Sequence, residues 1–199
     1  MNPGGAFAAA CFLAWTAIAI GDPVSQDPHI QVFAEPQAIA DFTLTNQDGQ
    51  PIRFKEFRGS VALVFFGFTH CPNICPTAMF TMKSLADSIE KAGQKPPAVV
   101  LVSIDGERDT PEVLKDHLAG YPQCFVGLTG DPKAVRQIAA DFKAVFFKGL
   151  PYDESGHYQV EHTPMIYLVD GEGRLRATFL DASVDAMAAT LRRLMPPAN

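Results

Sequence analysis

Positively charged side chains are scarce in this sequence of 199 residues. There are 16 Lys and Arg against 22 Asp and Glu, which gives a net charge of −6 and an isoelectric point near 5.3. No cluster of Lys or Arg reverses this balance locally, and the first basic residue is Arg53. Nucleic-acid binding depends mainly on basic residues that contact phosphates. The composition therefore argues against a nucleic-acid partner and favours a protein or a metal ion.

The sequence also lacks an apolar run long enough for an ordinary transmembrane helix. The run at residues 6–20 has 15 residues, whereas a helix that spans a bilayer needs about 20. This length suits the core of a signal peptide, and Ala17 and Ala19 resemble a cleavage site, although the usual basic segment before the core is missing. We expect residues 1–20 to be a signal peptide or a short membrane anchor. The remaining chain would be exported, to the periplasm or the outer face of the inner membrane.

The next segment has no sustained hydrophobic period. Residues 21–38 are rich in proline and polar side chains, so we predict a linker. The rest of the chain, residues 39–199, is long enough for one α/β domain with a substantial core, since 47% of the residues are apolar. We find no internal repeat and no low-complexity tract.

Cysteine is rare, with four in the chain, and two of the four lie close together after an apolar segment. Residues 61–68 are almost entirely apolar, which is typical of a strand buried on both faces. A helix is predicted to follow from Pro76, because a first helical turn tolerates proline. Cys71 and Cys75 therefore lie at a strand-to-helix junction, where the helix N-terminus favours thiolates. Two such thiolates can close a disulfide or bind a thiophilic ion such as Cu(I) or Zn(II).

The order of the predicted elements indicates the fold. The elements are a β-hairpin at 41–54, buried strands at 61–68 and 98–104 with a helix between them, helices that begin at Thr110-Pro111 and Asp131-Pro132, a short strand at 144–147, a second hairpin at 165–180 and a helix at 183–195. This is the order of a thioredoxin-like α/β fold, with a central mixed sheet flanked by helices and an N-terminal β-hairpin.

The same fold brings a distant histidine to the cysteines. It places Thr163-Pro164 directly before the third core strand, where thioredoxin-like folds commonly carry a cis proline that faces the cysteines. His162 is then expected to project into the same space, as a third ligand or as an acid–base partner for the thiols. A purely structural disulfide and an ordinary core histidine are the alternatives for these residues.

Several other residues have a structural explanation that the sequence favours. His70 is expected to point away from Cys71 or to support the loop, because neighbours in an extended segment face opposite ways. Met79 has the spacing of a core residue, although its thioether could assist a copper ion. Cys124 is expected to be a buried free thiol, and His157 a solvated residue. Three charged residues after the second buried strand are expected to pair with one another and to cap the following helix: Asp105, Arg108 and Asp109.

Four segments of the chain, in order, resemble sequence blocks of the Sco/SenC copper chaperones of cytochrome c oxidase assembly: FGFTHCPNICP (66–76), VSIDGERDTP (102–111), GLTG (127–130) and VEHTPMIYL (160–168). The resemblance spans residues 41–194. It implies that Cys71, Cys75 and His162 bind copper and that the domain lies outside the cytoplasm behind an N-terminal anchor or export signal. The partners would be a copper-receiving oxidase subunit or another copper chaperone, and a thiol reductant, since Cys71 and Cys75 can form a disulfide when oxidised and metal-free.

Three positions depart from the pattern of the Sco/SenC family. Asn73 stands where an acidic residue is usual, Gly106 stands where proline is usual, and Pro164 is closer to the thiol-oxidoreductase relatives. Two functions therefore stay open. One is a copper metallochaperone that holds one Cu(I) or Cu(II) ion through two thiolates and one imidazole. The other is a thiol:disulfide oxidoreductase, in which one thiol attacks a partner's disulfide and the other resolves the mixed disulfide. Only the first requires His162 as a ligand.

Overall fold

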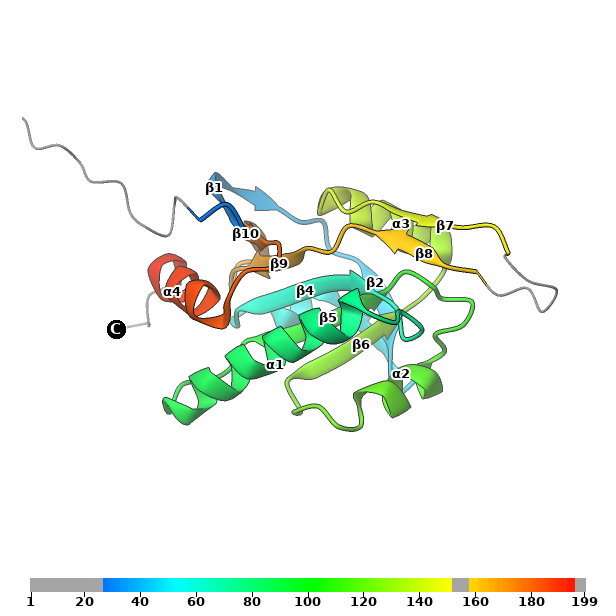
Figure 1. Ribbon diagram of the computed structural model, residues 1–199, viewed down its shortest axis with the longest axis horizontal. Helices are drawn as coiled ribbons and strands as arrows, with labels where there is room; N and C mark the ends of the chain where they lie inside the picture. Colours follow the sequence, from blue (N-terminus) through cyan, green and yellow to red (C-terminus); the bar gives the residue numbers. More distant parts are fainter. Residues whose placement is uncertain (1–26, 152–157, 196–199) are drawn as a thin grey trace, which may run out of the picture.

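The computed structural model describes residues 27–151 and 158–195, which form a mixed β-sheet with helices packed on it (Figure 1). The sheet has eight strands in the order β1-β10-β9-β4-β5-β6-β2-β3, and β7 and β8 make a separate two-stranded ribbon. This architecture confirms the predicted thioredoxin-like α/β class. Within the described ranges, no helix has the length and apolar character needed to cross a membrane. The expected signal peptide or anchor, residues 1–20, lies outside the described residues.

Three parallel strands form the centre of the sheet. β4 (Ala62–Gly67) pairs with β5 (Ala98–Ser103), and β5 pairs with β6 (Phe125–Thr129). Every residue of β4 is buried, because the sheet is covered on both faces. The sequence predicted β4 and β5 but not β6, since five residues with a central glycine give too short a hydrophobic pattern.

Antiparallel strands extend the sheet on both sides of this centre. They are β9 (Ile166–Val169), β10 (Arg174–Phe179) and β1 (Ile30–Ala38) on one side, and β2 (Thr43–Asn46) and β3 (Pro51–Arg53) on the other. Both predicted hairpins are confirmed, as β2–β3 and as β9–β10. The turn between β2 and β3 uses Gly49 with a φ of 74°, a conformation that glycine adopts without strain.

The linker predicted for residues 21–38 is wrong over its last part. Residues 30–38 form β1, which pairs with β10 at the edge of the sheet. The period-2 pattern of this strand is interrupted around Pro36, where the pairing register shifts between Val32 and Gln37. An edge strand tolerates proline, because the missing N–H faces away from the ladder. This irregularity hid the strand from a reading of the hydrophobic pattern.

The predicted helices are all present. They are α1 (Ile74–Lys91), α2 (Pro111–Leu118), α3 (Pro132–Asp141) and α4 (Val184–Leu194), with a short 3-10 helix at Phe54–Phe57. Thr110, Asp131 and Ser183 cap the last three α-helices, each accepting a backbone N–H with its side chain. α1 and α4 pack against each other.

Alternate residues of β4 point to opposite faces of the sheet and so show which helices cover each face. Gly67 faces α1, because a Cβ at this position would lie 3.0 Å from the Sγ of Cys75. Phe66 instead packs edge-on against Phe142 at the end of α3, with ring centroids 5.3 Å apart. α1 and α3 therefore cover opposite faces, and the end of β4 is directed at the first turn of α1.

The ribbon of β7 (Phe146–Lys148) and β8 (Val160–His162) lies outside the main sheet, and Phe146 is opposite His162 in its register (Figure 1). The sequence placed a strand at 144–147 but treated the residues up to 161 as a loop, because three residues are too few for a periodic signal. The expected cis proline is also wrong, since the described residues contain no cis peptide bond. Thr163 instead continues the extended ribbon by donating its N–H to the carbonyl of Val145 at 2.9 Å.

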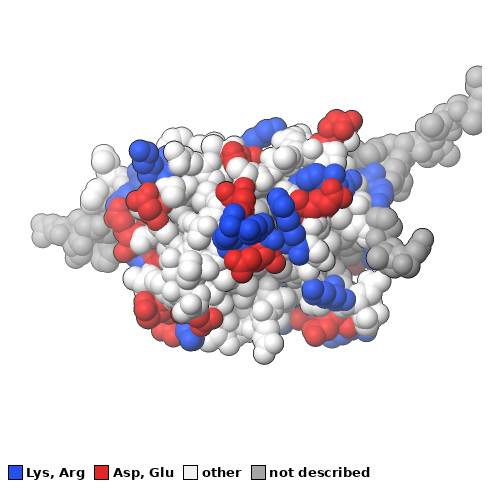
Figure 2. All heavy atoms as spheres, turned by 180° about the vertical axis from the view of Figure 1, so that it is seen from behind, with Lys and Arg blue, Asp and Glu red and all other residues white. Residues whose placement is uncertain are grey.

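Charged side chains of both signs are intermingled on the face shown in Figure 2. Ion pairs among the described residues include that of Arg174 with Asp170 at 2.8 Å. The picture agrees with the sequence, in which no cluster of Lys or Arg reverses the acidic balance.

Candidate metal centre

The junction between β4 and α1 positions the two cysteines. Cys71 lies in the turn after β4, where its N–H donates to the carbonyl of Phe68 at 3.3 Å. Cys75 is the second residue of α1 and is 2% exposed, and its N–H points at the Sγ of Cys71 at 3.4 Å. Cys71 is half-buried and borders a cavity, whereas Cys75 is buried. Both sulfurs lie at the N-terminal end of the helix, as the spacing predicted.

Gly67, the last residue of β4, leaves the space that Cys75 occupies. A Cβ at Gly67 would lie 2.7 Å from a ring carbon of Phe65 and 3.0 Å from the Sγ of Cys75. Real Cβ atoms essentially never approach other atoms to 2.7 Å. The close approach of the strand to the thiol therefore requires glycine at this position.

His162 reaches the cysteines from the end of β8. Its Nε2 lies 3.6 Å from the Sγ of Cys75, and the three ligand atoms of Cys71, Cys75 and His162 all lie within 4.8 Å of one another. The imidazole packs edge-on against the rings of Phe65 and Phe68, with centroids 5.8 and 6.0 Å away. The structure thus brings together the three residues that the sequence singled out.

The hydrogen bonding of His162 fixes which ring nitrogen is free. Its Nδ1 lies 3.3 Å from the carbonyl oxygen of Thr163, which can only accept, so Nδ1 carries the proton. Burial lowers the pKa of His162, and the bond to Thr163 opposes that shift only in part. In the neutral ring Nε2 then presents its lone pair towards Cys75. An imidazole held by its other nitrogen is the usual arrangement of a histidine metal ligand.

The two thiols differ in acidity. Partial burial alone would raise the pKa of Cys71, but backbone N–H groups of the first turn of α1, that of Cys75 above all, bring its pKa below the ordinary value. Burial raises the pKa of Cys75 well above its ordinary value, and the charges of Cys71 and Asp109 add to that increase. Cys71 is therefore the more readily ionised and more accessible sulfur, whereas Cys75 holds its proton until something replaces it.

A cavity of about 300 Å³ opens onto Cys71 and His162. Its walls include Cys71, Pro72 and Ile74 from the α1 side and Gln159 and His162 from the ribbon. An ion or a partner's ligating side chain can therefore reach Cys71 and His162 from outside, and the Sγ of Cys75 lies behind them, within 4.8 Å of both ligand atoms.

Asp109 holds the loop that carries the cysteines. It is fully buried, and it accepts hydrogen bonds from the N–H of Thr69 at 3.1 Å, the hydroxyl of Thr69 at 2.6 Å and the hydroxyl of Ser103 at 2.7 Å. The expectation that Asp109 pairs with Arg108 or caps α2 is wrong, because Thr110 supplies that cap. Asp109 ties the segment before Cys71 to the end of β5 instead.

The other half of the same loop holds the chain that leads into β8. Arg108 forms an ion pair with Asp105, as expected, and the hydroxyl of Tyr158 donates to the other Asp105 oxygen at 2.6 Å. The Arg108 guanidinium lies over the Tyr158 ring, 3.9 Å from its centroid, and donates to the Tyr158 carbonyl at 3.3 Å. Burial, followed by the hydrogen bond from its hydroxyl to Asp105, raises the pKa of Tyr158 to about 12. Sequence reasoning missed Tyr158, which stands 53 residues from Asp105 and belongs to no motif.

The other candidates lie outside the group of three. His70 is half-exposed, and its Nδ1 lies 2.9 Å from the Thr69 hydroxyl, so it supports the loop as expected. Met79 is fully buried in the core. Cys124 is a free, partly buried thiol, and burial raises its pKa. His157 lies outside the described residues. Among the described residues, Cys71, Cys75 and His162 are the one group of three or more His, Cys, Asp or Glu side chains placed to share an ion.

Comparison with known proteins extends this picture to a family. The profile of the SCO1/SenC family matches residues 33–196. The chain belongs to the SCO1/SenC family. It is 32% identical to the SCO2-like protein RT0576 of Rickettsia typhi over 152 residues, which covers 76% of this chain and 74% of that protein. It is 36% identical to the human mitochondrial SCO1 homolog over 141 residues, 70% of this chain and 45% of that protein.

A solved SCO1/SenC structure has the same fold. Bradyrhizobium japonicum ScoI, determined with copper bound, superposes with a TM-score of 0.68 at 32% identity. The match covers 78% of this chain and 98% of ScoI. Membership in the SCO1/SenC family and the thioredoxin-like fold, both expected from the sequence, are thus confirmed.

Proposed function

We propose that this SCO1/SenC protein is a copper metallochaperone that binds one copper ion through Cys71, Cys75 and His162. The observation that carries the proposal is the convergence of two sulfurs and one imidazole nitrogen within 4.8 Å. Thiolates are soft donors that suit Cu(I), and an imidazole nitrogen adds affinity for Cu(II). The similarity to B. japonicum ScoI, which was solved with copper bound, supports the same ion here.

The protonation states of the three residues suit capture and release of such an ion. Cys71 is the more readily ionised thiol and borders the mouth of the site, and the neutral His162 offers the lone pair of Nε2. Cys75 must lose its proton on binding, because burial raises its pKa. Copper affinity is therefore pH-dependent, and a protonated Cys75 favours release.

We further infer that the copper goes to cytochrome c oxidase, as the Sco/SenC resemblance implies. This chain transfers the copper directly to an oxidase subunit, or it transfers the copper to another copper chaperone that delivers it to the oxidase. The domain works outside the cytoplasm, where a signal or anchor in residues 1–20 would place it. A disulfide between Cys71 and Cys75 leaves no thiolate to donate, so a thiol reductant keeps the site competent.

A competition titration tests this function. We expect the reduced chain to take one Cu(I) per molecule from a competing chelator, and Cys71→Ser and Cys75→Ser each to lose that binding. Cys124→Ser is the matched control, because it removes a partly buried thiol that lies outside the site. Undiminished binding in Cys71→Ser, or an equal loss in Cys124→Ser, would contradict the proposal.

The difference in acidity between the thiols favours a second candidate, a thiol:disulfide oxidoreductase. An accessible thiol of lowered pKa beside a buried thiol of raised pKa is the arrangement of an attacking and a resolving cysteine. His162→Ala separates the two functions. The chaperone loses Cu(II) binding in this variant, whereas the oxidoreductase keeps its ability to reduce a protein disulfide.

A further inference from the structure

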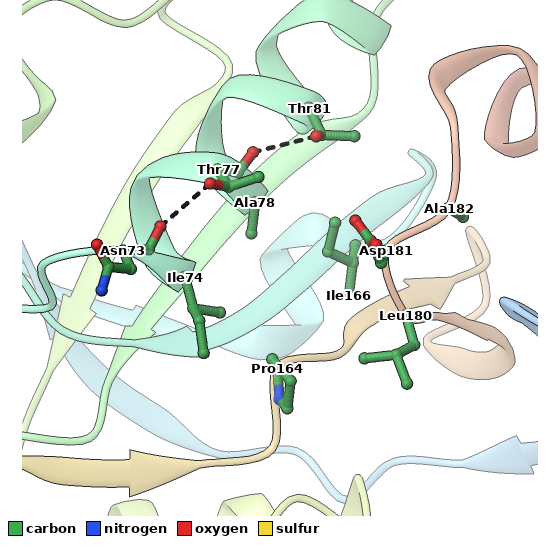
Figure 3. A pocket seen from close by; sticks show the side chains of 10 residues that line it. All are labelled: Asn73, Ile74, Thr77, Ala78, Thr81, Pro164, Ile166, Leu180, Asp181 and Ala182. Carbon is green, nitrogen blue, oxygen red and sulfur yellow. Dashed lines mark hydrogen bonds between the residues drawn. The ribbon is translucent and has the colours of Figure 1, made fainter.

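A second hollow, of about 310 Å³, lies beside the metal centre, and Figure 3 shows its walls. One wall is the start of α1, and the other is formed by the chain before β9 and by the corner between β10 and α4. Most of its lining is apolar: Ile74, Ala78, Pro164, Ile166, Leu180 and Ala182. Two of these side chains are unusually open for their type, with Ile74 47% and Leu180 40% exposed. We call this hollow the α1 groove.

The α1 groove is continuous with the metal centre. Asn73 and Ile74 line both the groove and the cavity that opens onto Cys71 and His162. These two residues stand between the two cysteines in the chain, and Pro164 follows His162 by two positions. A segment seated in the groove therefore lies next to the three donors.

The polar groups of the groove leave one unbalanced charge. The hydroxyls of Thr77 and Thr81 donate to helix carbonyls four residues earlier, at 3.1 and 3.0 Å, as the dashed lines in Figure 3 show. No Lys or Arg lines the groove, whereas the exposed carboxylate of Asp181 does. Within the described ranges, Asp181 has no ion pair or side-chain hydrogen bond. The groove thus combines apolar walls with a free negative charge at one end.

The corner that carries this charge is held in place. Leu180 donates its N–H to the carbonyl of His29 at 2.8 Å, and its own carbonyl accepts from the Nδ1 of His29 at 2.8 Å. Asp181 has a φ of 55°, in the left-handed region where Asp and Asn are the best tolerated residues after glycine. The carboxylate is therefore presented from a fixed backbone.

We propose that the α1 groove is the docking site of the protein that exchanges copper with this chain, and that it receives a segment in which an apolar side chain is followed by Lys or Arg. This rests on the proposed chaperone function and names the chemistry of its partner. The apolar side chain fills the space between Ile74 and Leu180, and the cation pairs with Asp181. A volume near the low end of the ~300–1,000 Å³ of small-molecule sites suits one or two side chains of a protein loop.

Disulfide tethering tests this proposal without copper. Blocked peptides Cys-Gly-Leu-Lys-Gly, Cys-Gly-Leu-Glu-Gly and Cys-Gly-Ser-Lys-Gly are activated as mixed disulfides with thionitrobenzoate and added to the reduced full chain, in which Cys11→Ser and Cys124→Ser remove the other two thiols. The Cys71 thiolate attacks the peptide sulfur, forms the new disulfide and releases thionitrobenzoate, whose absorbance gives the rate. Because Cys71 borders the cavity that shares a wall with the groove, a peptide that docks there reacts faster.

We expect the Leu-Lys peptide to react fastest. An exposed ion pair is worth about 0.2–1 kcal/mol, which corresponds to a roughly 1.4- to fivefold preference for Lys over Glu. Asp181→Asn should abolish this preference while keeping the backbone conformation, and Asp185→Asn, which removes an exposed charge outside the groove, should preserve it. Leu180→Ser should abolish the preference for Leu over Ser, whereas Phe80→Ser, an exposed α1 residue outside the groove, should not. Reaction with a small activated disulfide should be equal in all variants.

Equal rates for the three peptides with the unmodified chain would overturn the proposal. Equal effects of Asp181→Asn and Asp185→Asn would also overturn it, because the preference for Lys would then depend on the overall negative charge of the protein and not on Asp181. If Leu180→Ser instead weakens a concentration-dependent dimer of the unmodified chain, the occupant is a second copy, and the proposal also fails. Failure of copper binding together with intact peptide preferences would remove the chaperone function and leave the docking site. Intact copper binding with equal peptide rates would remove the docking site and leave the chaperone function.

Discussion

Replacing Asp109 tests whether the loop after β5 positions the metal centre. Asp109→Ala removes the acceptor of three hydrogen bonds, two from Thr69 and one from Ser103. Thr69 precedes Cys71 by two residues, so the change acts on the path of the chain into the site. Asp109→Asn is the matched variant, because it keeps the shape of the side chain and one acceptor oxygen.

The hydrogen bonds of Asp109 allow the losses of stability in Asp109→Ala and Asp109→Asn to be estimated. In Asp109→Ala the hydroxyls can turn to other acceptors, but the N–H of Thr69 cannot, and a lost partner for a buried donor costs about 1–3 kcal/mol. With the lost hydroxyl bonds we expect the free energy of unfolding to fall by about 3–5 kcal/mol. In Asp109→Asn the amide oxygen can serve Thr69 N–H and Ser103, and the Thr69 hydroxyl can accept from the amide, so the loss is about 1–2 kcal/mol. Copper affinity should fall ~10–100-fold in the alanine variant, as for other groups that orient ligands.

Urea unfolding and Cu(I) competition measure the two quantities on the same samples, under conditions in which the variants are folded. The refuting result is specific. If Asp109→Ala loses the expected free energy of unfolding but binds Cu(I) within twofold of the unmodified chain, the hydrogen bonds stabilise the fold and do not position the site.

Three further outcomes are expected. Gly67→Ala should lower both stability and copper affinity, because the added Cβ would press on Phe65 and Cys75. Gly120→Ala should lower neither, because a Cβ at Gly120 has nothing within 4 Å. Equal copper affinity in the two variants would contradict the expectation for Gly67. Alkylation of the metal-free chain should modify Cys71 first, with a pH midpoint below that of the same thiol in the urea-unfolded chain, since its pKa is lowered; an equal or higher midpoint would contradict this. For Asp170, burial alone would raise the pKa, but hydrogen bonds from an arginine and from backbone N–H groups bring it below its ordinary value, so its contribution to stability is present at neutral pH and lost as the pH falls through the folded-state pKa. Asp170→Asn should therefore cost about 1–3 kcal/mol of unfolding free energy at pH 7, and the difference should shrink below about pH 3.9; a difference independent of pH would contradict the assignment.

The sequence predicted the cysteine half of the site because its determinants are local. A buried strand, a short turn and a helix start follow one another between residues 61 and 76, and each has its own pattern. His162 was predicted from the order of elements, since no local pattern joins it to the cysteines. The mechanism expected for its placement was wrong. A cis proline was expected at position 164, whereas His162 is held at the end of β8 and the Thr163–Pro164 bond is trans.

The supporting residues were harder to predict for a physical reason. Thr110 before Pro111 was predicted to cap α2 and does so, but Asp109, an equally good capping residue in the adjacent position, was expected to share that role. The structure gives the cap to Thr110 and buries Asp109 under the cysteine loop. The role of Tyr158 and the groove around Asp181 depend on contacts between segments far apart in the chain. The hydrophobic periodicity of the sequence is a local signal and does not predict such contacts.

The most direct test of the metal centre is X-ray absorption at the copper edge, on the reduced chain loaded with one Cu(I) and on His162→Ala treated in the same way. We expect two sulfur neighbours and one imidazole nitrogen in the first sample, and two sulfur neighbours without the imidazole in the second. The same copper environment in both samples, or an environment without sulfur, would contradict the assignment of Cys71, Cys75 and His162 as the copper ligands.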